Sequence, residues 1–188
     1  MRPSTLLFTS FALLFAASVP AQETGANWQT ILHDRLPVYG HRNWIVIADS
    51  AYPVQSSDGI ETIVSNADHF QVLETVINAL ERSKHVRPNI YTDRELGAIA
   101  DSDAPGISAY RDQLSAYLNT LPLSSPPVTT LSHEKILAKL DQVSQTFRVL
   151  VIKTNMALPY TSVFLELDCA YWSPDAEHRV RAALAAQK

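Results

Sequence analysis

Histidine and carboxylate side chains flank a short apolar segment in the first third of the sequence. His41 precedes the run Trp44 to Ala48, and Asp49 follows it directly. A near-continuous apolar run of this length suits a strand buried on both faces of a mostly parallel sheet. Imidazole and carboxylate groups exchange protons near neutral pH, so the chemistry available to these residues is general acid/base catalysis.

Two further polar segments stand at expected element boundaries, Ser132-His133-Glu134 and Pro159-Tyr160-Thr161-Ser162. An α/β scaffold usually builds its site from polar groups at strand ends and in loops. Each residue also has a structural interpretation. A lone histidine beside a strand is often structural, Asp49 can make an Asx-turn, His133 can be a solvated first-turn residue, and Tyr160 can pack beside its proline. The candidate site residues are His41, Asp49, His133, Tyr160 and Ser162.

Helical and strand patterns alternate along the chain and would position these groups. Apolar spacing predicts helices over 27–36, 70–80 (capped by Asp68), 107–121, 132–140 and 175–186. Apolar runs predict strands over 44–48, 88–91, 128–131, 147–153 and 162–167. The pattern predicts an α/β fold, a single layered domain with a mostly parallel central sheet flanked by helices. Four histidines without a pattern are expected on the surface: His33, His69, His85 and His178.

The first 21 residues have the features of a secretory signal peptide. Arg2 precedes an apolar run from Leu6 to Val19, and Val19-Pro20-Ala21 places small residues before Gln22. The run is short for a membrane span. We expect cleavage to leave one domain, residues 22–188, that is secreted or periplasmic and not bound to a membrane. An uncleaved N-terminal anchor is the alternative.

Charge and known motifs exclude several classes of function. The net charge is −4 and no basic cluster occurs, so nucleic acid is not an expected partner. The single cysteine, Cys169, excludes an intrachain disulfide. The sequence has no Gly-rich phosphate loop, no Cys/His zinc spacing and no Gly-x-Ser-x-Gly elbow. Nothing in the spacing demands a metal, and neither a metal nor a cofactor is expected.

Residues 40–53, read as one unit, resemble the first motif of the D-ribose pyranase / L-fucose mutarotase family. The shared features are the Gly-His pair, the buried strand, an Asp at the same spacing and a Pro shortly after it. Segments 130–134 and 149–165 resemble two later elements of that family in the same order. The resemblance covers about residues 27–168, and the helical segment 173–188 is an extension.

The resemblance implies an exported mutarotase or pyranase that interconverts sugar anomers or ring forms. It implies that His41 is the acid/base, that Asp49 orients or charges it, and that His133, Tyr160 and Ser162 hold sugar hydroxyls. It further implies a monosaccharide ligand and a homo-oligomer in which a neighbouring subunit completes each site. The alternative is a non-catalytic sugar-binding or structural relative, because Leu137 and Ser162 stand where the family has Lys and Asn. A third hypothesis is an interaction protein that binds a partner through its last amphipathic helix.

Overall fold

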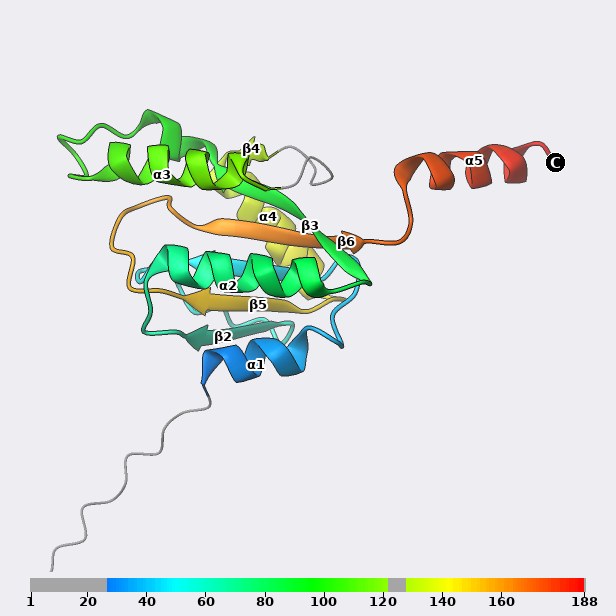
Figure 1. Cartoon of the computed structure of the whole chain (residues 1–188), viewed down its shortest axis with the longest axis horizontal. Coiled ribbons are helices and arrows are strands. Elements are labelled where there is room, and N and C mark those ends of the chain that lie inside the picture. Colours follow the sequence, from blue (N-terminus) through cyan, green and yellow to red (C-terminus); the bar gives the residue numbers. More distant parts are fainter. Residues whose placement is uncertain (1–26, 122–127, 188) are drawn as a thin grey trace, which may run out of the picture.

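The computed structural model describes residues 27–121 and 128–187, in which six strands form one mixed sheet (Figure 1). The strand order is β2-β5-β1-β6-β3-β4. The strands are β1 (Trp44–Ala48), β2 (Ile60–Val64), β3 (Val86–Asp93), β4 (Thr129–Leu131), β5 (Val149–Lys153) and β6 (Val163–Cys169). The helices are α1 (Trp28–Arg35), α2 (His69–Arg82), the 3₁₀ turn η1 (Arg94–Ala98), α3 (Ile107–Asn119), α4 (His133–Ser144) and α5 (Pro174–Ala185).

The directions of the strands determine which strand ends lie at the same edge of the sheet. β1, β2 and β5 run parallel, β3 and β4 run parallel, and β6 lies antiparallel between β1 and β3. Ile47 of β1 therefore pairs with Ile152 on one side and Val163 on the other. The predicted α/β class with a mostly parallel sheet is confirmed, with β6 as the reversed strand. The carboxyl ends of β1 and β3 share one edge with the amino end of β6.

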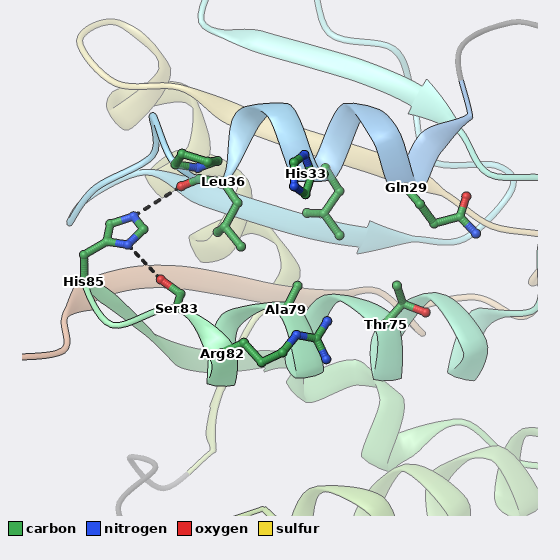
Figure 2. A pocket seen from close by; sticks show the side chains of 10 residues that line it. Gln29, His33, Leu36, Thr75, Ala79, Arg82, Ser83 and His85 are labelled. Carbon is green, nitrogen blue, oxygen red and sulfur yellow. Dashed lines mark hydrogen bonds between the residues drawn. The ribbon is translucent and has the colours of Figure 1, made fainter.

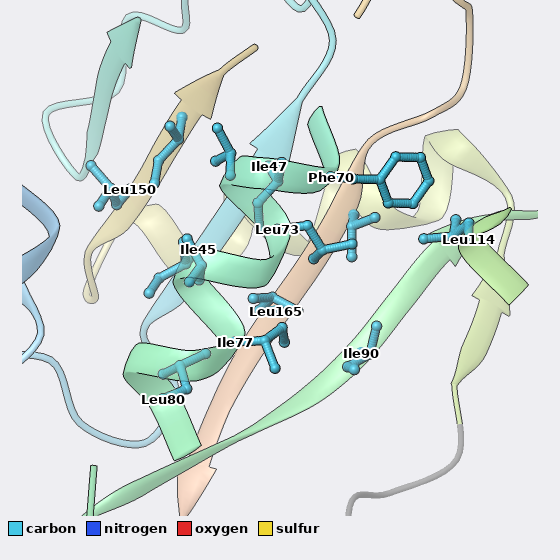
Figure 3. Close-up of a cluster of buried hydrophobic side chains, with 14 of the residues drawn as sticks. Ile45, Ile47, Phe70, Leu73, Ile77, Leu80, Ile90, Leu114, Leu150 and Leu165 are labelled. Atoms are coloured by element: carbon cyan, nitrogen blue, oxygen red, sulfur yellow. The ribbon is translucent and has the colours of Figure 1, made fainter. Parts of the chain in front are cut away.

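Both faces of the sheet are buried, because residues alternate between them along each strand. On one face, Ile45 and Ile47 belong to a core that α1, α2 and α3 cover. Figure 3 shows the apolar side of α2 lying over the strands, with Leu73 and Ile77 next to Leu165. On the other face, Trp44, Val46 and Ala48 pack with Ile136 and Leu140 of α4. Burial on two faces explains the continuous apolar run of β1.

Several elements differ from the sequence-based expectation. β2 was not predicted, because its Ile-Glu-Thr-Ile-Val run lies partly exposed at the sheet edge. β3 is longer than 88–91. Pro88 fits because, among the residues that the structure describes, none pairs with the β4 side of β3 before Tyr91. The expectation of a surface position for His69 is wrong: it starts α2 and is 0% exposed.

The last helix lies apart from the sheet (Figure 1). α5 contains no buried residue, and Ser173 caps it by accepting the backbone N–H of Ala176. None of the helices in the described ranges is long and apolar enough to span a membrane. The predicted signal peptide, residues 1–21, lies outside the described residues.

Candidate functional site

Three strand ends bring polar side chains together at the edge where β1 and β3 finish and β6 begins. Asp49 follows β1, Asp93 is the last residue of β3, and Ser162 immediately precedes β6. His133 begins α4, directly after β4, which pairs with the end of β3. Open α/β sheets bind their ligands at this carboxyl edge. The structure thus brings four of the five predicted residues, Asp49, His133, Tyr160 and Ser162, to one region.

Asp49 joins the end of β1 to the start of β6. Its Oδ1 accepts the backbone N–H of Ala51 at 2.9 Å, which is the predicted Asx-turn. Its Oδ2 accepts the hydroxyl of Ser162 at 3.2 Å. Ser162 is 2% exposed, whereas Asp49 is half-buried. The Asp49 carboxylate therefore makes the Asx-turn and also contacts another candidate site residue.

Asp93 and His133 form a second pair. Asp93 Oδ1 lies 3.1 Å from His133 Nδ1, and the side chains are 1% and 27% exposed, respectively. The backbone N–H of His133 donates to Glu95 Oε2 at 3.0 Å, so Glu95 replaces the expected Ser132 cap of α4. With Asp93 ionised, Nδ1 carries the hydrogen and the Nε2 lone pair is free. A catalytic carboxylate orients an imidazole in the same way.

The surroundings of Asp93 disfavour the ionised form of its carboxyl group. Burial raises its pKa to about 6, the bond and charge of His133 act in the opposite direction, and the nearby carboxylates of Glu95 and Asp49 raise it further. Its Oδ2 is buried without a hydrogen-bond partner among the described residues, as is the hydroxyl of Tyr52. Burial, followed by the charge of Asp93, also raises the pKa of Tyr52. A perturbed carboxyl beside a histidine is typical of acid/base sites.

Tyr160 borders the same cluster. Its ring centroid lies 5.4 Å from that of His133, at 89° between the planes, and the residue is 38% exposed. Tyr160 has φ 56°, the left-handed region that non-glycine residues seldom adopt. Backbone strain of this kind persists where the surroundings hold it, which is often at functional sites.

His41 lies elsewhere. It is exposed in the turn before β1, whereas Asp49 follows β1. The four residue steps of β1 alone separate them by about 13 Å, since a strand rises about 3.3 Å per residue. His41 instead lines a hollow of about 520 Å³ with Asp168 and Trp172, near the start of α5. Within one protomer, the structure does not bring His41 to the other candidates.

Sequence reasoning missed Asp93, Glu95 and Tyr52. Asp93 ends a strand just as Asp49 follows one, so an extension of the predicted strand 88–91 by two residues would have identified it. Tyr52 and Glu95 had no such signal, because only the fold brings them to this edge. Among the described residues, no group of three or more His, Cys, Asp or Glu side chains is placed to hold a metal ion.

A separate apolar hollow of about 420 Å³ lies between α1 and α2 (Figure 2). Its lining includes the apolar side chains of Leu32, Leu36 and Ala79 and the charged side chain of Arg82. His85 closes one end through contacts with Ser83 at 2.8 Å and with the carbonyl of Leu36 at 3.2 Å. This hollow lies on the face of the sheet covered by α1 and α2, and none of the candidate site residues lines it.

Comparisons with known proteins complete the description. No family model matches the chain, and no curated protein matches it. It is similar to the structure of Bacillus subtilis RbsD complexed with D-ribose, with 21% identity, a TM-score of 0.47, and 86% of this chain and 98% of that chain covered. It is also similar to the fucose mutarotase of Streptococcus pneumoniae in complex with L-fucose, with 17% identity, a TM-score of 0.49, and 79% of this chain and 98% of that chain covered. A third similar structure is FucU from Bifidobacterium longum, with 14% identity, a TM-score of 0.49, and 74% of this chain and 94% of that chain covered. These proteins are of the kinds that the sequence motifs resemble.

Proposed function

We propose that this chain is an exported monosaccharide mutarotase or pyranase that works by acid/base catalysis in the periplasm or outside the cell. The observation that carries the proposal is the Asp93–His133 pair beside Asp49 and Ser162 at one edge of the sheet. This edge offers one imidazole that can exchange a proton and several oxygens that can hold sugar hydroxyls. The motifs that resemble the mutarotase family supply the substrate class.

Mutarotation needs two proton transfers. One group removes the proton from the anomeric hydroxyl while the ring C–O bond breaks, and a second group protonates the ring oxygen. The open-chain aldehyde then recloses on its other face, and both protons return. His133 Nε2, with Asp93 on Nδ1, suits the first transfer, because the carboxylate holds the ring in place and accepts the hydrogen of Nδ1. Asp49, Ser162 and Tyr160 are placed to hold hydroxyls.

The second proton group in this proposal is His41 of another copy of the chain. His41 and Asp49 occupy opposite ends of β1, so one protomer cannot use both on a single sugar. In a closed ring, a head-to-tail contact would place the amino end of β1 from one protomer at the carboxyl edge of the next. This separation supports the proposed oligomer, as does the resemblance.

Exchange NMR tests the activity. Saturation transfer between anomers of L-fucose and D-ribose, with and without the protein, measures catalysed interconversion. His133→Gln should lower the catalysed rate about 10²- to 10⁴-fold, the usual contribution of a general acid/base. The control is His178→Gln, because His178 is exposed on α5. Wild-type exchange in His133→Gln would remove this residue from the mechanism.

Subunit mixing tests the shared site. His41→Ala and Asp93→Asn, each inactive alone, should regain part of the activity when they are unfolded and refolded together, since mixed oligomers contain some intact sites. A monomer at micromolar concentration that is still active would refute the arrangement. Binding of a sugar without any exchange would favour the alternative, a non-catalytic sugar-binding relative.

A further inference from the structure

A chain of buried hydrogen bonds lies directly beneath the candidate site, centred on His69. Its Nδ1 is 3.1 Å from Thr154 Oγ1, and its Nε2 is 3.1 Å from the hydroxyl of Tyr110. The Tyr110 hydroxyl donates to the backbone carbonyl of Thr161 at 2.6 Å. The four residues are at most 4% exposed. The network links α2 and α3 to the two segments that follow β5 and precede β6.

Both ends of this network contact backbone carbonyls of residues next to site residues. Thr161 stands between Tyr160 and Ser162, so the bond to its carbonyl fixes the segment that presents both side chains. At the other end, the backbone N–H and the hydroxyl of Thr154 each lie 2.9 Å from the carbonyl of Ala48, the residue before Asp49. The network therefore connects the two halves of the Asp49–Ser162 contact.

The number of hydrogens determines the direction of the bonds. With neutral His69, the side chains supply three hydrogens: one each from Thr154, His69 and Tyr110. If Tyr110 donates to Thr161, His69 must carry its hydrogen on Nε2 and donate to Tyr110. Nδ1 then accepts the Thr154 hydroxyl, which gives up its own bond to the Ala48 carbonyl, while the Thr154 backbone N–H still donates to that carbonyl. In the other tautomer, Tyr110 donates to Nε2 and the Thr161 carbonyl loses this donor.

The surroundings of His69 keep the ring neutral. Burial lowers its pKa to about 4, although the carboxylates of Asp68, at the start of the same helix, and Asp49, at the end of β1, act in the opposite direction. Tyr110 packs edge-on to the imidazole, with ring centroids 5.6 Å apart. Burial also raises the pKa of Tyr110, so its hydroxyl stays protonated and keeps its hydrogen for donation.

We propose that His69 is a positioning residue for the sugar site: in its Nε2–H form it directs the Tyr110 hydroxyl to the Thr161 carbonyl and so holds Ser162 against Asp49 and Tyr160 beside His133. The inference rests on the proposed function for its catalytic consequence, but the hydrogen-bond direction stands apart from it. Tyr160 adopts φ 56°, and a clamp on the next carbonyl is a physical reason for this conformation to persist.

The ring hydrogens are measured directly by two-bond ¹H–¹⁵N correlation spectra of the imidazoles. His69 should show a protonated Nε2 and a bare Nδ1 at pH 7, and it should remain neutral at pH 5.5. A hydrogen on Nδ1 would overturn the inference, because Tyr110 would then donate to His69 instead of Thr161.

Tyr110→Phe removes the donor to Thr161 while it keeps the packed ring. The matched control on the same helix is Tyr117→Phe, since Tyr117 is half-buried. We expect Tyr110→Phe to shift the backbone amide resonances of residues 160–162 and to raise KM for L-fucose or D-ribose about tenfold, the scale of one lost buried hydrogen bond. Tyr117→Phe should change neither. A merely structural role would lower the yield of active protein and leave KM unchanged.

The outcomes separate this inference from the proposed function. If the wild-type protein does not interconvert sugars, the proposed function fails, while the amide shifts in Tyr110→Phe and the His69 tautomer still test the clamp. Unshifted amides of residues 160–162 in folded Tyr110→Phe would overturn the clamp even in an active enzyme. If Tyr110→Phe does not fold, the tautomer in the wild-type protein decides.

Discussion

Replacement of Asp93 by Asn should change the stability of the protein in a pH-dependent way. Asp93 is 2% exposed, and burial raises the pKa of its carboxyl from 3.8 to about 6 in the folded state. Between these two values the folded protein keeps a proton that the unfolded chain has lost. The free energy of unfolding of the wild-type protein therefore falls as the pH rises through this window, and it stays lower above pH 6.

The size of the effect follows from the pKa difference. A shift of about 2 units, at 1.36 kcal/mol per unit, corresponds to about 3 kcal/mol of lost stability at pH 8. At pH 4 only a small part of that loss is present, because the unfolded carboxyl is then about half ionised. Asn cannot ionise, and its Oδ1 can still accept from His133 Nδ1. Asp93→Asn should thus gain about 2–3 kcal/mol relative to wild type between pH 4 and pH 8.

Urea unfolding of both proteins at pH 4, 6 and 8 measures this difference. The control is Asp103→Asn, because Asp103 is exposed. Titrating groups that lie away from Asp93 are common to variant and wild type and cancel. A stability difference between Asp93→Asn and wild type that does not vary with pH would refute the reasoning. The variant should also lose mutarotase activity, so stability would rise as function falls.

Three further outcomes are expected. Gly59→Ala should destabilise the protein by about 1–3 kcal/mol, measured by urea unfolding, because an added Cβ would lie 1.9 Å from the carbonyl oxygen of Ser144. A Gly97→Ala control meets no atom within 4 Å. His41→Ala should abolish sugar exchange without a change in Tm, since His41 is exposed, and unchanged exchange would exclude it from the mechanism. Intact mass of the exported protein should correspond to a chain that begins at Gln22, and a retained Met1 would contradict cleavage.

The sequence predicted those parts of the fold whose signal is local. Trp44–Ala48 has its strand limits as predicted because burial on both faces leaves five apolar residues in a row. Asp68 caps α2 as expected, since its Oδ1 accepts the N–H groups of Phe70 and Gln71. β2 was not predicted because it lies at the edge of the sheet and contains polar residues. The reversed direction of β6 leaves no trace in its own residues, because it depends on its neighbours.

The same distinction applies to the site. Asp49, His133, Tyr160 and Ser162 were recognisable because each stands at an element boundary, and the fold brings those boundaries to one edge. The pairing of His133 with Asp93 was not recognisable, since 40 residues separate them in the chain. His69 seemed an ordinary surface residue because its partners, Tyr110 and Thr154, belong to distant elements. Sequence indicates which groups are available, whereas long-range packing determines which of them meet.

The position of β6 has a consequence for the order in which the chain can fold during synthesis. β1 lies between β5 and β6, and both of these strands come more than 100 residues later in the chain. Until residue 169 is available, β1 lacks both neighbours and β3 lacks its long antiparallel partner, so the middle of the sheet cannot close. Contacts of such sequence separation form slowly. A nascent chain would therefore stay open until almost all of it has been made, which is compatible with the proposed export, because an exported chain passes through its channel before it folds.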